Sequence, residues 1–101
     1  MQLKDQALLR EAAYIDGAWV GADDGARFDV TNPADGSRIA AVPNMGAAET
    51  RRAIAAADAA LPAWRARTAK ERAVILRKWF ELIMAAQEDL AVLMTSEQGK
   101  P

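Results

Sequence analysis

The segment from Ala69 to Ala86 constrains the fold of this chain more than any other. Its large apolar residues recur with helical spacing, and at about 100° per residue they cover an arc of roughly 200°. These residues are Ile75, Leu76, Trp79, Phe80, Leu82, Ile83 and Met84. A surface helix needs an apolar stripe of only about 100°, so we expect this helix to be packed on two sides. Thr68 and Glu71 form a capping box at its start, which satisfies backbone N–H groups of the first turn.

Two more helices are expected before this one. Residues 1–13 are rich in good helix formers and predict a short N-terminal helix. A second helix begins near Gly46, with Glu49 in its first turn, where the helix dipole favours an anion. Pro62 lies inside this second pattern, which predicts a break or kink near Leu61.

Another helix is expected to follow the one at 69–86, from Gln87 to about Glu97, with Gly99 as its stop signal. Its apolar stripe comprises Leu90, Leu93 and Met94. Glu97 falls where this stripe requires another apolar side chain, and it lies near a helix C-terminus, where the dipole disfavours an anion. Such local inconsistencies concentrate at functional sites. The alternative is that the helix has frayed by this point and Glu97 faces water.

Residues 14–43 are expected to form a small antiparallel β meander. Asp16 and Gly17 suit a two-residue type I′ turn, which requires positive φ at both positions. Residues 27–31 alternate between polar and apolar, as a half-buried strand does, and residues 37–42 form the next strand. The expected elements are therefore a helix at 1–13, a meander at 14–43 and three helices within 46–99.

These elements are too few to cover both sides of the helix at 69–86. Each fully buried Leu, Ile or Phe contributes roughly 1.5–3 kcal/mol, so a second face left in water would forfeit several such contributions. The chain has 101 residues, enough for one domain, and its last residues, Gly99 to Pro101, bring no closing element. We therefore expect an N-terminal piece of a larger protein, or a domain that associates.

Composition excludes several classes of function. The net charge of −1 gives no electrostatic reason to expect a nucleic-acid or anionic-membrane partner. The chain has no Cys and no His, so by itself it offers no thiol or imidazole catalysis and no Cys/His zinc site. No apolar run approaches the roughly 20 residues of a membrane span, and the first residues do not resemble a signal peptide. A cytoplasmic location is the expectation.

Five sequence blocks, in order, resemble the aldehyde dehydrogenase superfamily. The first two match the hairpin pattern Y-I-x-G-x-W and the turn pattern N-P-x-x-G of that family. The blocks are Tyr14 to Trp19, Asp29 to Gly36, Ala60 to Trp64, Thr68 to Arg72 and Glu97 to Pro101. Within the family, the resemblance is strongest to members that oxidise succinic semialdehyde with NADP.

The resemblance implies an α/β fold in which residues 1–101 are the N-terminal segment of the cofactor-binding domain. The meander and helices would pack on its Rossmann-like part, and this would cover the second face of the helix at 69–86. Family members oxidise aldehydes to acids with NADP or NAD through a Cys thiohemiacetal, commonly as homotetramers or dimers. No catalytic or cofactor-binding residue can be assigned in this chain, so we expect residues 1–101 alone to be inactive.

One family site does reach this segment. Many members hold a structural monovalent cation with backbone carbonyls just before the Asn-Pro turn and an acidic side chain just before Gly-Lys. The matching positions here are Val30, Thr31 and Glu97. A hard cation prefers such oxygen ligands, although Glu is longer than the Asp usual at this position. A different class of function also stays open: a stand-alone helical module that binds a partner through its apolar face without catalysis.

Overall fold

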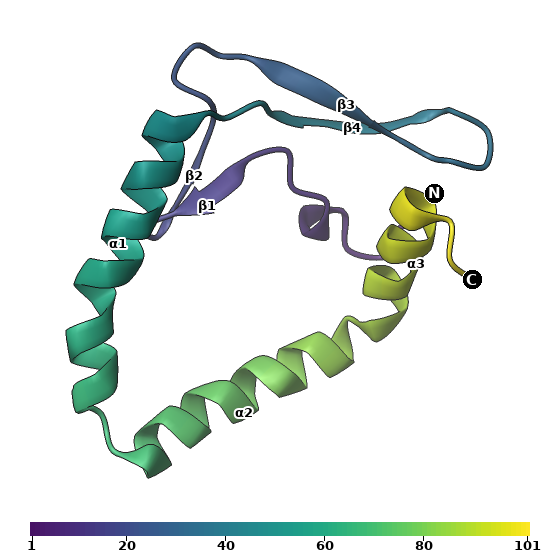
Figure 1. Cartoon of the computed structure of the whole chain (residues 1–101). Helices are drawn as coiled ribbons and strands as arrows, with labels where there is room; N and C mark the ends of the chain where they lie inside the picture. The colour runs from purple at the N-terminus through teal and green to yellow at the C-terminus, as the bar shows by residue number, and fades with distance from the viewer.

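The computed structural model describes residues 1–101 as two β-hairpins joined to three helices that form an open frame (Figure 1). The elements are a short 3₁₀ helix η1 (Gln6–Leu8), strands β1 (Ala13–Ile15), β2 (Ala18–Val20), β3 (Arg27–Thr31) and β4 (Arg38–Pro43), and helices α1 (Ala47–Ala66), α2 (Ala69–Ala85) and α3 (Gln87–Gln98). None of the helices is long and apolar enough to cross a membrane.

The strands are antiparallel, as predicted, but they form two separate hairpins, β1–β2 and β3–β4. The first hairpin turns at Asp16 and Gly17, whose φ angles of 51° and 76° confirm the predicted type I′ turn. Across this hairpin Tyr14 lies opposite Trp19, with their rings edge to face and the ring centroids 5.1 Å apart.

The expected helix over residues 1–13 is wrong. Only the three residues of η1 are helical, with the Asp5 side chain accepting a hydrogen bond from the Ala7 N–H at 3.0 Å. The N–H groups of Lys4 and Asp5 instead donate to the Asp89 carboxylate, 85 and 84 residues away along the chain. This tertiary contact outweighs helix propensity, which is worth only tenths of a kcal/mol per residue (about 0–0.7).

Of the break or kink expected near Leu61, the break is wrong, because α1 continues through Pro62 to Ala66. A proline removes one intrahelical N–H donor, and the carbonyl it leaves without a partner belongs to the residue four positions earlier. That residue, Asp58, is exposed, so water can satisfy its carbonyl. The helix start at Gly46, the capping-box Thr68 and the stop at Gly99 are confirmed.

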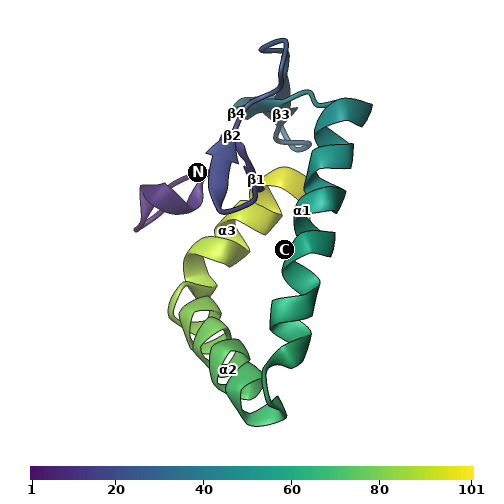
Figure 2. The ribbon, with the colours of Figure 1, turned by 90° about the vertical axis from the view of Figure 1, so that its left-hand side faces the viewer.

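Little of the chain is buried. Only 6 of 101 residues are buried, and the buried apolar ones are Leu3, Ala40 and Ala41. The radius of gyration is 16.6 Å, against about 13 Å for a compact domain of 100 residues. Seen from the side, α1 and α2 diverge from their common turn with the hairpins at the far end (Figure 2). The structure therefore exposes many large apolar side chains and has only a very small buried core.

Candidate functional site

The end of β3 carries two of the three residues expected to hold a cation. Val30 and Thr31 are its last residues, and they pair with Ala40 and Arg38 across a shift of register. A bulge of this kind interrupts the ladder of backbone hydrogen bonds. Carbonyl groups at this strand end can therefore accept an outside ligand more readily than those in the middle of the ladder.

The turn that follows is held by its own hydrogen bonds. The Asn32 N–H donates to the Ser37 carbonyl at 2.8 Å, and the Gly36 N–H donates to the Asn32 carbonyl at 2.7 Å. Asp35 accepts from the Ser37 N–H at 2.9 Å and from its hydroxyl at 2.7 Å. These hydrogen bonds from Ser37 lower the pKa of Asp35. The turn is thus built rigidly, and the Asp35 carboxylate is already engaged within it.

Glu97, the third expected residue, lies exposed in the last turn of α3. The helix ends at Gly99, whose φ is 76° and whose N–H donates to the Thr95 carbonyl at 2.8 Å. A Cβ added at Gly99 would lie 3.1 Å from Cγ of Pro33. The end of α3 therefore packs against the turn that follows Thr31 (Figure 1), so the segment that carries Glu97 and the segment that carries the two β3 residues are neighbours.

This region can offer oxygen donors of two kinds, backbone carbonyls and one carboxylate. No group of three or more acidic, Cys or His side chains that could hold a metal ion is present. Any cation bound here would therefore depend mainly on carbonyl oxygens, which suit a weakly charged, hard ion better than a transition metal.

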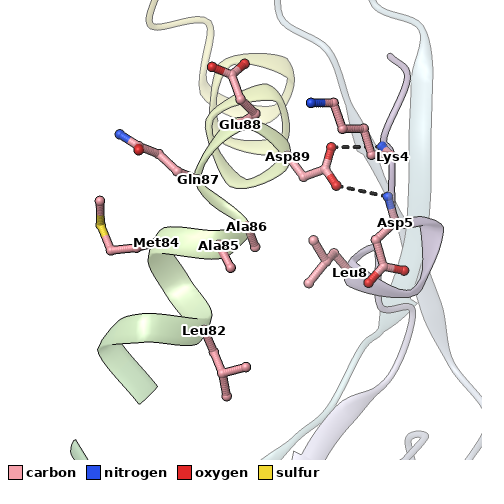
Figure 3. A pocket seen from close by; sticks show the side chains of 10 residues that line it. All are labelled: Lys4, Asp5, Leu8, Leu82, Met84, Ala85, Ala86, Gln87, Glu88 and Asp89. Carbon is pink, nitrogen blue, oxygen red and sulfur yellow. Dashed lines mark hydrogen bonds between the residues drawn. The ribbon is translucent and has the colours of Figure 1, made fainter. Parts of the chain in front are cut away.

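A buried carboxylate that the sequence analysis missed is the best-defined polar contact of the chain. Asp89, in the first turn of α3, is only 7% exposed. Its two oxygens accept from the backbone N–H groups of Lys4 and Asp5, each at 2.9 Å (Figure 3). These hydrogen bonds, the one from Lys4 first, lower the pKa of Asp89. The only sequence signal is an acidic pair, Glu88 and Asp89, at a helix start, which does not show what either residue contacts.

Asp89 also lies beside an open cavity of about 590 Å³. The N-terminal segment forms one wall and the corner between α2 and α3 forms the other, with Leu8 and Leu82 on opposite sides (Figure 3). The cavity is half apolar and holds no cluster of titratable groups besides those already described. It is therefore a gap between elements rather than a catalytic cleft.

The apolar face of α2 is open to solvent along its whole length. Its exposed large residues are Val74, Ile75, Leu76, Trp79, Phe80, Leu82, Ile83 and Met84, each at least 42% exposed. The polar side carries the Arg77–Glu81 pair, with 3.5 Å between Nε and Oε1. Monomeric soluble proteins rarely expose contiguous apolar patches of this kind unless they mark an interface. The expectation that α2 is packed on two sides is thus not met within these residues.

Comparison with known proteins gives consistent matches. A sequence profile described as "Aldehyde dehydrogenase family" matches residues 19–101. A glutarate-semialdehyde dehydrogenase of Pseudomonas aeruginosa is 67% identical over 101 residues, which are 100% of this chain and 21% of that protein. A succinate-semialdehyde dehydrogenase (NADP+) of Escherichia coli is 61% identical over the same share of each chain.

The fold agrees with these matches. A crystal structure of succinate-semialdehyde dehydrogenase from Burkholderia pseudomallei superposes with a TM-score of 0.96 and 56% identity, covering 100% of this chain and 21% of that one. The expected arrangement of antiparallel strands followed by helices is therefore confirmed. The chain spans about a fifth of the length of these relatives (21%).

Proposed function

The chain belongs to the aldehyde dehydrogenase family, and we propose that it is the N-terminal segment of an NAD(P)-dependent enzyme that oxidises a semialdehyde to a dicarboxylic acid. The observation that carries this proposal is the identity of 61–67% along the whole chain to relatives named for such reactions. The open face of α2 supports the same proposal, because further residues of the protein are needed to cover it.

The proposed substrate is a short, linear aldehyde with a carboxylate at its other end. Succinic semialdehyde is the substrate expected from the sequence motifs, and glutaric semialdehyde, one methylene longer, enters from the name of a relative. A pocket discriminates one methylene by only about 1–3 kcal/mol, so one enzyme can accept both. NADP is the proposed cofactor, with NAD as the alternative, in line with the name of the Escherichia coli relative.

The chemistry of the proposed reaction lies on residues outside these 101. The chain has no Cys to attack the aldehyde carbonyl, and it has no G-x-G-x-x-G loop opening a helix to receive a pyrophosphate. Residues 1–101 therefore serve as a scaffold that packs on the Rossmann-like part of the cofactor-binding domain. They are inactive alone, and the whole enzyme is proposed to be a cytoplasmic homotetramer or dimer.

The scaffold also supplies a proposed site for a structural monovalent cation. The backbone carbonyls of Val30 and Thr31 and the carboxylate of Glu97 are the proposed ligands. The close packing of Gly99 on Pro33, where an added Cβ would lie 3.1 Å from Cγ of the proline, supports this because these two residues belong to the segments that carry the ligands. Such an ion would tie α3 to the β3–β4 hairpin and neutralise a carboxylate at a helix end where the dipole disfavours it. Replacing sodium and potassium with a bulky organic cation is expected to lower the melting temperature of the full-length protein, and to lower that of its Glu97→Gln variant by less, because the variant keeps the carbonyl ligands but loses the charged one.

A steady-state assay of the full-length protein tests the main proposal. Reduction of NADP is measured with succinic and glutaric semialdehydes and, as matched controls, with butanal and pentanal, which lack the carboxylate. We expect kcat/KM to be at least about a hundredfold higher for the semialdehydes, because a site built for an anion rejects an analogue without it. Turnover of the simple alkanals alone would exclude the proposed substrate class.

The alternative, a stand-alone helical module without catalysis, is favoured by the same exposed face of α2. The two functions are distinguished by the length of the natural protein. A full-length product ending near residue 101 that is monodisperse and has no dehydrogenase activity would support the module and contradict the enzyme.

A further inference from the structure

The N-terminal segment from Leu3 to Glu11 crosses from α3 to the β3–β4 hairpin and is fastened at both ends by a carboxylate. At the α3 end, Asp89 accepts from two successive backbone N–H groups, those of Lys4 and Asp5, at 2.9 Å each (Figure 3). Successive N–H groups form a concave site for an anion. The pair of bonds therefore holds this stretch of backbone in one position.

The hairpin end is fastened through Glu11. Its Oε1 accepts from the backbone N–H of Ala41 in β4 at 3.0 Å, and its carbonyl accepts from the Arg27 guanidinium in β3 at 3.0 Å. The Arg38 guanidinium approaches the same carboxylate at 4.0 Å. Both the main chain and the side chain of Glu11 are thus bound to the hairpin.

The position of the Asp89 carboxylate is specific. A carboxylate at the third position of a helix can accept from the N–H of the residue that caps the helix start. Here α3 has no side-chain cap, and both oxygens of Asp89 are turned to a segment at the other end of the sequence. The carboxylate therefore serves the contact between segments rather than its own helix.

Four of the six buried residues lie at these two ends: Leu3 and Asp89 at one, Ala40 and Ala41 at the other. Leu3, 7% exposed, precedes the two residues that Asp89 binds, and Ala41, 9% exposed, donates to Glu11. Since only six residues are buried in all, the contacts of this segment account for a large share of the protected interior.

We propose that residues 3–11 form a strap with two fasteners, Asp89 and Glu11, and that the strap loosens as one unit when either fastener is removed. The strap ties α3 to the β3–β4 hairpin independently of any bound cation and of the reaction that the enzyme catalyses. A purely local role for either carboxylate would leave the other end unaffected, and this difference makes the proposal testable.

Amide hydrogen exchange of the full-length protein measures the strap directly. In Asp89→Asn, the backbone N–H groups of Lys4 and Asp5 face an amide with one acceptor, and their protection is expected to fall about tenfold or more, since hydrogen bonds to charged groups are the strong ones. The N–H of Ala41, at the far fastener, is expected to exchange faster as well. Glu11→Gln is expected to produce the same pair of changes, starting from the other end.

Glu88→Gln is the matched control, because it removes a carboxylate from the same helix turn that has no partner in the strap. It is expected to change the protection of the Lys4, Asp5 and Ala41 amides by no more than about twofold. An effect equal to that of Asp89→Asn would show that Asp89 acts only through the helix dipole. Loosening confined to the mutated end would overturn the strap as a unit. If Asp89→Asn does not fold, Glu11→Gln decides: faster exchange of the Lys4 and Asp5 amides as well as of Ala41 supports the proposal, and a change confined to Ala41 contradicts it.

Discussion

Replacement of Trp79 with alanine tests whether the apolar face of α2 is covered in the full-length protein. Trp79 lies in the middle of the helix, is 62% exposed within residues 1–101, and neighbours Leu82 and Ile83 on the open face. If the rest of the protein packs on this face, the indole becomes buried, and its removal costs the free energy of that burial. If the face stays in water, its removal costs little.

The exposed area sets the size of the effect. A buried Trp covers roughly 150–250 Å², so the open 62% of Trp79 corresponds to roughly 90–155 Å². At about 25 cal/mol per Å², covering this area contributes about 2–4 kcal/mol to the free energy of unfolding. The cavity left by the substitution adds to this loss, in line with the roughly 3–5 kcal/mol found for Trp→Ala changes in cores.

Denaturant unfolding of the full-length Trp79→Ala protein measures this loss, with Lys78→Ala as the matched control on the polar side of the same helix. The control is expected to change the free energy of unfolding by less than about 0.5 kcal/mol, as surface substitutions do. Equal effects of the two substitutions would refute the reasoning, because they would show that no part of the protein covers α2.

Three further predictions rest on single residues. Hydrogen bonds from Lys4 and Asp5, and the charge of Lys4, hold the pKa of Asp89 below the ordinary 3.8. The strap is therefore expected to stay closed above that value and to open as the pH falls through the lowered pKa. Amide exchange of the strap against pH measures this, and opening as the pH rises would contradict it. In thermal melts, Gly99→Ala is expected to destabilise the full-length protein by about 1–2 kcal/mol, since φ is 76° and the ring of Pro33 would lie 3.1 Å from the new Cβ. The control Gly21→Ala, where φ is not positive and the space around the new Cβ is open, is expected to be neutral. Thr68→Ala is expected to cost about 1 kcal/mol through loss of the helix cap, and Thr68→Ser to restore most of it; equal melting temperatures for the two would show that the cap does not stabilise α2.

The sequence predicts which residues form the candidate cation site, and the structure shows that the segments carrying them are neighbours. A resemblance and one carboxylate out of pattern predict Val30, Thr31 and Glu97, although 65 residues separate Thr31 from Glu97 along the chain. The structure adds the contact of Gly99 with Pro33, which places the two segments side by side. Asp89 had no such signal, because an acidic residue in a first helical turn is common and its partners lie at the opposite end of the chain.

The turns and helix ends of this fold follow from residues that are close together in the sequence. The type I′ turn at Asp16, the cap at Thr68 and the stop at Gly99 depend on φ angles and hydrogen bonds within a few residues, so neighbouring residue types suffice to predict them. The course of the N-terminal segment depends instead on a distant contact, because the Asp89 carboxylate accepts from the N–H groups of Lys4 and Asp5, more than 80 residues away along the chain. A short segment with weak intrinsic preference adopts whichever conformation satisfies its backbone, and here the satisfying partner comes from another helix.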